Sequence, residues 1–183
     1  MSRRKSRAFH ATGAVLLALL WVVSGCSERP TPVQSSSSKR YAPVVRPAHG
    51  KVAAADQWVE ATRTITPEAG GAIEVGDEII GKSSLAVPPG AVSAPVEITM
   101  KATTSGPVVV EFAPKFEFAK PVTVSISYRG ADLTGVDETN LTVLYNNEAS
   151  SEWELVTSAV NLNSKAVVGY LRHFSQYAVG SEH

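Results

Sequence analysis

The sequence predicts an all-β protein, and three observations lead to that class. Apolar and polar residues alternate over residues 122–129, as in a strand with one buried and one exposed face. Clusters of Gly, Pro, Asn and Ser interrupt such runs at short intervals, as turns do. Beyond residue 64, no long stretch spaces its apolar residues as a helix would. Short strands joined by turns indicate an antiparallel sandwich or barrel, and we favour the β-sandwich.

The predicted strands follow one another along the second half of the chain. Each alternates apolar and polar residues, and together they include residues 96–100, 116–118, 122–129, 141–145 and 153–155. Gly, Pro, Asn and Ser clusters mark the turns at 70–71, 88–90, 105–107, 130, 146–147 and 161–164. Pro88 and Pro89 cannot donate to a neighbouring strand, so a strand is expected to end before them. The folded domain is expected over residues 63–181.

Residues 1–25 have the pattern of a targeting signal. Basic residues crowd residues 3–7, and an apolar run over residues 14–23 is too short to cross a bilayer as a helix. Every acidic residue follows Cys26, so the chain beyond the signal is mildly acidic. A nucleic-acid partner would require a basic surface, so we predict no nucleic-acid binding.

The segment Val23-Ser24-Gly25-Cys26 resembles the lipobox of bacterial lipoproteins. The resemblance implies that residues 1–25 are a lipoprotein signal peptide, cut before Cys26. It also implies a diacylglycerol on the Cys26 thiol and an N-acyl group, such as palmitate, on the new N-terminus. Ser27 is typical of sorting to the outer membrane where the organism has one. The alternatives are a plain secretory signal or an uncleaved anchor helix.

Residues 26–62 are expected to be the lipidated cysteine followed by a flexible tether. Prolines and serines are frequent here, and such a stretch cannot bury enough apolar surface to offset its chain entropy. Residues 52–59, with Trp58, fit either a helical turn or an edge strand. A tether of this length would place the body on the order of 30 to 35 Å from the anchor.

One segment imitates a phosphate-binding loop. Residues 76–83, GDEIIGKS, contain the two glycines followed by lysine and serine of that motif. Such a loop presents backbone N–H groups at the start of a helix, but Asp77 and Glu78 would place carboxylates there. The prolines at 88–89 also prevent a helix from following. A hairpin tip is the better interpretation, so we predict no nucleotide site.

Metal and cofactor sites are also not expected. His49, His173 and His183 are scattered, and Cys26 is the only cysteine, so no ligand cluster is visible. The single cysteine also excludes an internal disulfide, so the body must fold on its core alone. We predict no metal and no cofactor other than the lipid on Cys26.

Four motifs occur in order along the body: Gly70-Gly71, LAVPPGAV at 85–92, FAKPV at 118–122, and His173-Phe174-Ser175-x-Tyr177. Together, over residues 64–180, they resemble the ZU-five domain of ankyrins, zonula occludens proteins and netrin receptors. The resemblance implies a β-sandwich used mainly for protein contacts. We therefore expect an extracytoplasmic, membrane-anchored lipoprotein whose domain is a protein-binding or scaffolding module with a protein partner in the cell envelope.

The same resemblance implies an alternative, because some ZU-five members cut themselves between Phe and Ser. Ser175 would attack the Phe174 carbonyl carbon, with His173 as general base or orienting group, and water would hydrolyse the resulting ester. This chain departs from those members because it has one β-domain and only residues 175–183 would follow the cut. We favour a structural role for the motif and therefore no enzyme activity.

A geometric requirement applies to both interpretations. In one regular strand over residues 172–179, Phe174 would face away from Tyr177 and Val179. Burying all three on one side requires a bulge or corner near residues 175–176. A kink there suits a strained scissile bond, and it equally suits a last strand that changes sheets.

A further alternative is a cell-wall or carbohydrate-binding module. Trp58, Trp153 and Tyr145 are the candidate stacking platforms for sugar rings. We expect Trp153 to lie in the core instead.

Overall fold

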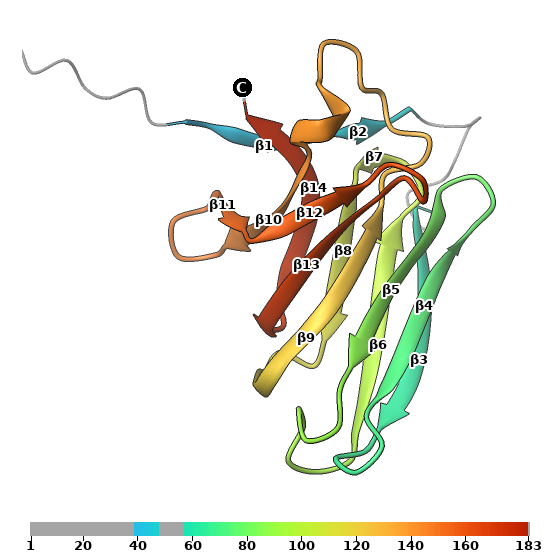
Figure 1. Cartoon of the computed structure of the whole chain (residues 1–183), viewed down its shortest axis with the longest axis vertical. Helices are drawn as coiled ribbons and strands as arrows, with labels where there is room; N and C mark the ends of the chain where they lie inside the picture. Colours follow the sequence, from blue (N-terminus) through green and yellow to red (C-terminus); the bar gives the residue numbers. More distant parts are fainter. Residues whose placement is uncertain (1–38, 48–56, 183) are drawn as a thin grey trace, which may run out of the picture. The chain divides into compact units, whose positions relative to one another are not determined.

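The computed structural model describes residues 39–47 and 57–182, which form two main antiparallel sheets packed face to face (Figure 1). Buried side chains from both sheets belong to one hydrophobic cluster. Within these residues the only helical element is the short 3-10 turn η2 (Glu138–Asn140). The predicted fold class, an antiparallel β-sandwich, is confirmed. The predicted signal peptide and Cys26 lie outside the described residues.

The larger sheet has seven strands in the order β11-β10-β14-β8-β6-β3, with β1 pairing with the last residues of β14. Its strands are β1 (Tyr41–Pro43), β3 (Trp58–Ile65), β6 (Val96–Thr103), β8 (Val109–Ala113), β10 (Thr142–Asn147), β11 (Glu152–Val156) and β14 (Gln176–Glu182).

The smaller sheet has five strands in the order β12-β13-β9-β5-β4. Its strands are β4 (Gly71–Asp77), β5 (Gly81–Val87), β9 (Glu117–Ser127), β12 (Ser158–Asn161) and β13 (Ala166–His173). A separate short pair, β2 (Val45–Arg46) with β7 (Gly106–Pro107), lies at one end of the sandwich.

The core follows from the alternation that the sequence displays. In β9, Val122, Val124 and Ile126 are fully buried, whereas Thr123 and Ser125 between them are half-buried on the other face. Each such aliphatic side chain stabilises the fold by about 1.5 to 3 kcal/mol when it leaves water. The predicted strands at 96–100, 116–118, 141–145 and 153–155 all fall within or next to strands of the structure.

The predicted tether is wrong over part of its length. Residues 41–46 form β1 and β2, and β3 begins at Trp58, so the folded body starts well before residue 63. Pro43 ends β1, where a missing N–H group costs nothing, so the proline content of this region does not exclude strands. Residues 26–38 and 48–56 of the predicted tether lie outside the described part.

The segment that imitates a phosphate loop is a hairpin, as predicted. It connects β4 to β5, and Asp77 Oδ1 accepts hydrogen bonds from the N–H groups of Ile79 and Ile80 at 2.8 and 2.9 Å. The carboxylate therefore occupies backbone donors that a phosphate would need. Gly81 adopts a φ of +71°, and a Cβ there would lie 2.2 Å from Ser127 Oγ, so glycine is required at this turn.

Arg46, in β2, is a buried arginine, only 3% exposed. Its guanidinium donates to four backbone carbonyls. They belong to Thr103 at the end of β6 (2.8 Å), Ile80 in the β4–β5 turn (3.4 Å), Ser127 at the end of β9, and Arg129 just after β9 (3.0 Å). Burial lowers the pKa of Arg46 to about 10, so the group stays charged at neutral pH. One side chain thus ties the first described segment to both sheets.

Replacing Arg46 by Met should destabilise the protein strongly, because buried carbonyl oxygens would lose their donors. We expect the free energy of unfolding to fall by about 3 kcal/mol or more, measured by urea unfolding. Arg40→Met is the matched control, since Arg40 is exposed and makes no hydrogen bond within the described residues. It should change stability by no more than about 0.5 kcal/mol. Equal, small effects of both substitutions would contradict this role of Arg46.

The connection between β9 and β10 is held by Glu138. Its Oε1 accepts hydrogen bonds from the Lys165 ammonium and from the Tyr128 hydroxyl, both at 2.6 Å. These two bonds, that of Lys165 first, lower the pKa of the Glu138 carboxyl from its ordinary value of 4.5. The connection is therefore fastened through an ionised carboxylate.

The stability of the protein should depend on pH through the Glu138 carboxyl. A carboxyl with a lower pKa in the folded chain stabilises the fold above its ordinary pKa, and this contribution is lost as pH falls through the folded pKa. We expect the urea midpoint to decline below a pH of about 4.5, and less steeply in Glu138→Gln. Glu68→Gln, at an exposed glutamate, should retain the full decline. Parallel pH profiles for the wild type and Glu138→Gln would rule this explanation out.

Candidate functional site

The His173-Phe174-Ser175 motif lies where the chain passes from one sheet to the other. β13, in the five-stranded sheet, ends at His173, and β14, in the seven-stranded sheet, begins at Gln176. The register of β13 against β9 already shifts between Leu171 and His173. The predicted corner is therefore present, and the irregularity begins a few residues before the expected position. The last strand changes sheets at the bond that self-cleavage would break.

Phe174 is a core residue, 3% exposed. Its ring stacks on Phe112 with centroids 4.8 Å apart, and it meets Phe116 and Phe118 edge to face at 5.0 and 4.7 Å. Its N–H donates to the Phe116 carbonyl at 2.9 Å. Contacts to both sheets therefore hold this side chain and its backbone in place. The predicted core role of Phe174 is confirmed.

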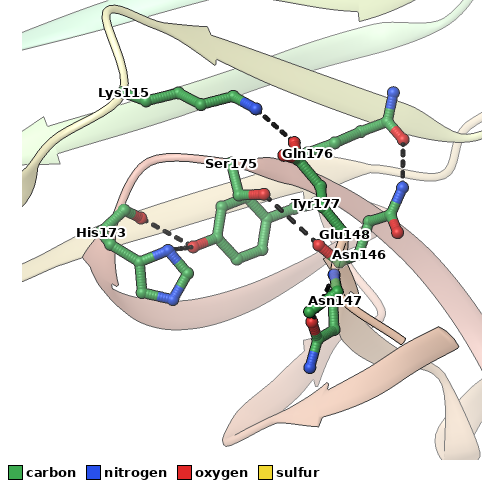
Figure 2. Close-up of polar contacts among 9 residues, drawn as sticks. Lys115, Asn146, Asn147, Glu148, His173, Ser175, Gln176 and Tyr177 are labelled. Atoms are coloured by element: carbon green, nitrogen blue, oxygen red, sulfur yellow. Dashed lines mark hydrogen bonds and ion pairs between the residues drawn. The ribbon is translucent and has the colours of Figure 1, made fainter. Parts of the chain in front are cut away.

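The imidazole of His173 is directed to Tyr177 (Figure 2). The Tyr177 hydroxyl donates to the His173 carbonyl at 2.7 Å, and its oxygen lies 3.4 Å from Nδ1 of the same residue. Because the hydroxyl gives its single hydrogen to the carbonyl, the contact with Nδ1 fits an N–H donor on the ring. Burial raises the pKa of Tyr177, so this phenol stays neutral. The ring of Tyr145 packs edge-on against His173 at 4.9 Å.

Ser175 is also buried, 6% exposed, and its hydroxyl has a different partner. Its Oγ donates to the backbone carbonyl of Asn146 in β10 at 3.5 Å (Figure 2). The neighbouring Gln176 accepts a hydrogen bond from the Asn146 side-chain amide at 3.0 Å. The start of β14 is thus joined to β10 by two polar contacts of one asparagine.

This arrangement does not couple the nucleophile to a base. A serine hydroxyl becomes a nucleophile when a neighbouring group accepts its proton, and a backbone carbonyl is not a base. The described residues place Asn146 at the Ser175 hydroxyl and Tyr177 at the His173 imidazole. The motif here lies at a passage between two sheets, in which the Ser175 hydroxyl, the His173 carbonyl and the Phe174 N–H group each have a hydrogen-bond partner in the surrounding chain.

The sequence located these three residues but missed their partners. Asn146 and Tyr177 receive the polar groups of Ser175 and His173. Tyr177 belongs to the motif, but its alternation pattern predicts only that the ring is buried. Asn146 stands in a predicted turn, whereas it is the fifth residue of β10. No local pattern relates residue 146 to residue 175, because the contact arises from strand pairing.

The three candidate sugar platforms do not form one surface. Trp58 begins β3 and Trp153 lies in β11, at opposite edges of the seven-stranded sheet. Tyr145 packs against His173 and Tyr177 instead. Trp153 is half-buried against a small cluster of Val109, Leu144 and Ala178 rather than in the main core. The expectation that Trp153 belongs to the main core is therefore wrong.

Within residues 39–47 and 57–182, no three His, Cys, Asp or Glu side chains gather as a metal site would require. The described residues contain no helix that could cross a bilayer. Cys26, the predicted lipid attachment site, lies outside them.

Comparison with models of known protein families found no match, and no curated protein sequence is significantly similar to the chain. The resemblance to the ZU-five domain therefore rests on the motifs quoted above.

Because the Ser175 hydroxyl donates to a backbone carbonyl and, within the described residues, forms no hydrogen bond to a side chain that could act as its base, the purified protein should stay intact at the Phe174–Ser175 bond. Intact-mass spectrometry should give one species and no fragment of residues 175–183. Ser175→Ala should leave this mass pattern unchanged and lower stability by no more than about 1 kcal/mol, because one long hydrogen bond is lost. A fragment present in the wild type and absent in Ser175→Ala would overturn the structural interpretation.

Proposed function

We propose that this protein is an extracytoplasmic lipoprotein, anchored to a membrane through Cys26, whose β-sandwich is a protein-binding or scaffolding module. The observation that carries the proposal is the order of three features at the N-terminus. Basic residues at 3–7, a short apolar run at 14–23 and the lipobox-like Val23-Ser24-Gly25-Cys26 follow one another. The absence of any other cysteine in the sequence makes Cys26 the single candidate for lipidation.

The start of the folded body brings the module closer to the anchor than the sequence suggested. Lys39 is already part of the body, since its ammonium pairs with Glu182 of β14 at 2.8 Å. Residues 27–38 alone join Cys26 to Lys39, and a flexible chain of that length spans only about 20 Å on average. The proposed module therefore works near the membrane surface and meets partners there.

The strand order supports a role in protein contacts. β3 is an edge of the seven-stranded sheet and, within the described part, pairs only with β6. An edge strand offers unpaired backbone groups to which a strand of a partner can add. Arg63 of β3 donates to the Ala72 carbonyl in β4 at 2.8 Å, which holds the edge against the second sheet. The β3 edge is thus held in a fixed position to which a strand of a partner could add.

The anchor is tested by replacing Cys26 with Ala in the full chain. The wild type should incorporate an alkyne-tagged palmitate and partition into the detergent phase, whereas Cys26→Ala should do neither, because no other thiol can be acylated. Ser24→Ala is a control that leaves the thiol in place and should be labelled. Membrane partitioning of Cys26→Ala equal to that of the wild type would contradict the proposal.

The contact surface is tested by photo-crosslinking in intact cells. A crosslinking residue at Thr64, exposed on the edge strand β3, should give protein adducts. The same residue at Ala86, exposed on the interior strand β5, should give few, because β5 is paired on both sides. Equal adduct formation at both positions would exclude a contact specific to the β3 edge.

A further inference from the structure

Two hollows share Tyr41 of β1 as a lining residue. The larger, of about 660 Å³, lies between β1, the end of β14 and the connection that contains η2. The smaller, of about 420 Å³, lies between β1 and the β10–β11 turn and is bounded by Trp153. Tyr41 lines both, and we call the two hollows together the Tyr41 cleft.

The two aromatic rings of this cleft rest on buried apolar side chains. Tyr41 and Trp153 both pack against the buried cluster of Val109, Leu144 and Ala178, which is separate from the main core. Each ring is only partly covered. The Tyr41 hydroxyl and the Trp153 indole N–H form no hydrogen bond within the described residues, so both polar groups remain available. Rings anchored in this way are rigid platforms that retain a free polar edge.

The larger hollow adds oxygen-rich side chains to the platform. Thr134, Asn140 and Glu182 line it together with Asp137. Hydrogen bonds from Thr139 lower the pKa of the Asp137 carboxyl, so it is ionised at neutral pH and can accept hydrogen bonds from hydroxyl groups. Glu182 is paired with the Lys39 ammonium at 2.8 Å, so the Asp137 carboxylate is the group that disfavours a phosphate or a uronate beside it.

The smaller hollow has donors instead. Lys39, Arg40 and Trp153 line it together with Glu152, and the Lys39 ammonium is paired with Glu182, which leaves Arg40 as its exposed cationic donor. A donor set next to an aromatic ring suits the carbonyl oxygen of an acetamido group, whereas the acceptors of the larger hollow suit sugar hydroxyls. From these two linings we propose that the Tyr41 cleft binds a neutral, N-acetylated oligosaccharide, with its sugar rings stacked on Tyr41 and Trp153. This inference does not depend on the lipid anchor.

Fluorescence can test the site directly, because the chain has three tryptophans. In the full chain, Trp21→Phe and Trp58→Phe leave Trp153 as the only emitter. Titration with a β-1,4-linked N-acetylglucosamine hexasaccharide should shift its emission to saturation. An uncharged, unstructured Gly/Ser peptide of similar length should give no shift. No saturable shift with the hexasaccharide, or an equal one with the peptide, would overturn the proposal.

Variants then assign the contacts by calorimetry. Tyr41→Ala and Trp153→Ala should each weaken hexasaccharide binding roughly tenfold, equivalent to about 1.4 kcal/mol. Trp58→Ala is the matched control at the opposite edge of the sheet and should bind as the wild type does. Asn140→Ala removes one exposed amide of the larger hollow and should weaken binding with an unchanged circular dichroism spectrum. This variant keeps the test decisive if Tyr41→Ala unfolds.

A negatively charged oligosaccharide tests whether the cleft prefers neutral sugars. An oligogalacturonate of the same length should bind at least roughly tenfold more weakly than the hexasaccharide, because it has no acetamido groups and the Asp137 carboxylate repels its carboxylates. Equal affinity for the two oligosaccharides, or equal loss of affinity in Trp58→Ala and Trp153→Ala, would contradict the site.

Discussion

The guanidinium of Arg46 is the interaction on which the arrangement of this molecule depends. A charged group in the interior is costly unless each of its donors is satisfied, and here the acceptors are backbone carbonyls, three of them belonging to Thr103, Ser127 and Arg129. Those carbonyls belong to strand ends of both sheets. The position of β2 therefore depends on strand ends of both sheets. β1, which directly precedes β2, pairs with the last residues of β14.

The crossing of the last strand follows a similar logic. Phe174 fills the aromatic core, and Tyr177 is buried on the other side of the corner, so β13 and β14 cannot form one straight strand. The polar groups left at the corner are satisfied by Asn146 and by Tyr177 itself. A motif that resembles a self-cleaving one thus serves in this chain to connect two sheets, with its hydroxyl and its imidazole bound to different partners.

The placement of β1 connects the fold with both proposed functions. Pairing of β1 with β14 brings Tyr41 beside Trp153, and the two rings cover an apolar cluster on the outside of the seven-stranded sheet. The same pairing shortens the chain available between Cys26 and the body. A sugar-binding surface and a membrane anchor would then lie at the same end of one chain, whereas β3, which pairs only with β6 within the described residues, lies at the edge of the sheet opposite β11.

The sequence by itself determined the fold class, most of the strands and the burial of Phe174 and Tyr177, because a half-buried strand repeats its pattern every two residues. It also located the hairpin at residues 76–83, because the residues that favour turns can be recognised from the local sequence. Only the tertiary structure decided that residues 41–46 belong to the body, that Arg46 is buried, and that Asn146 and not His173 receives the Ser175 hydroxyl. These contacts join residues far apart in the chain. They become favourable only when strands pair and side chains are buried, and a local sequence pattern does not show which distant segments will meet.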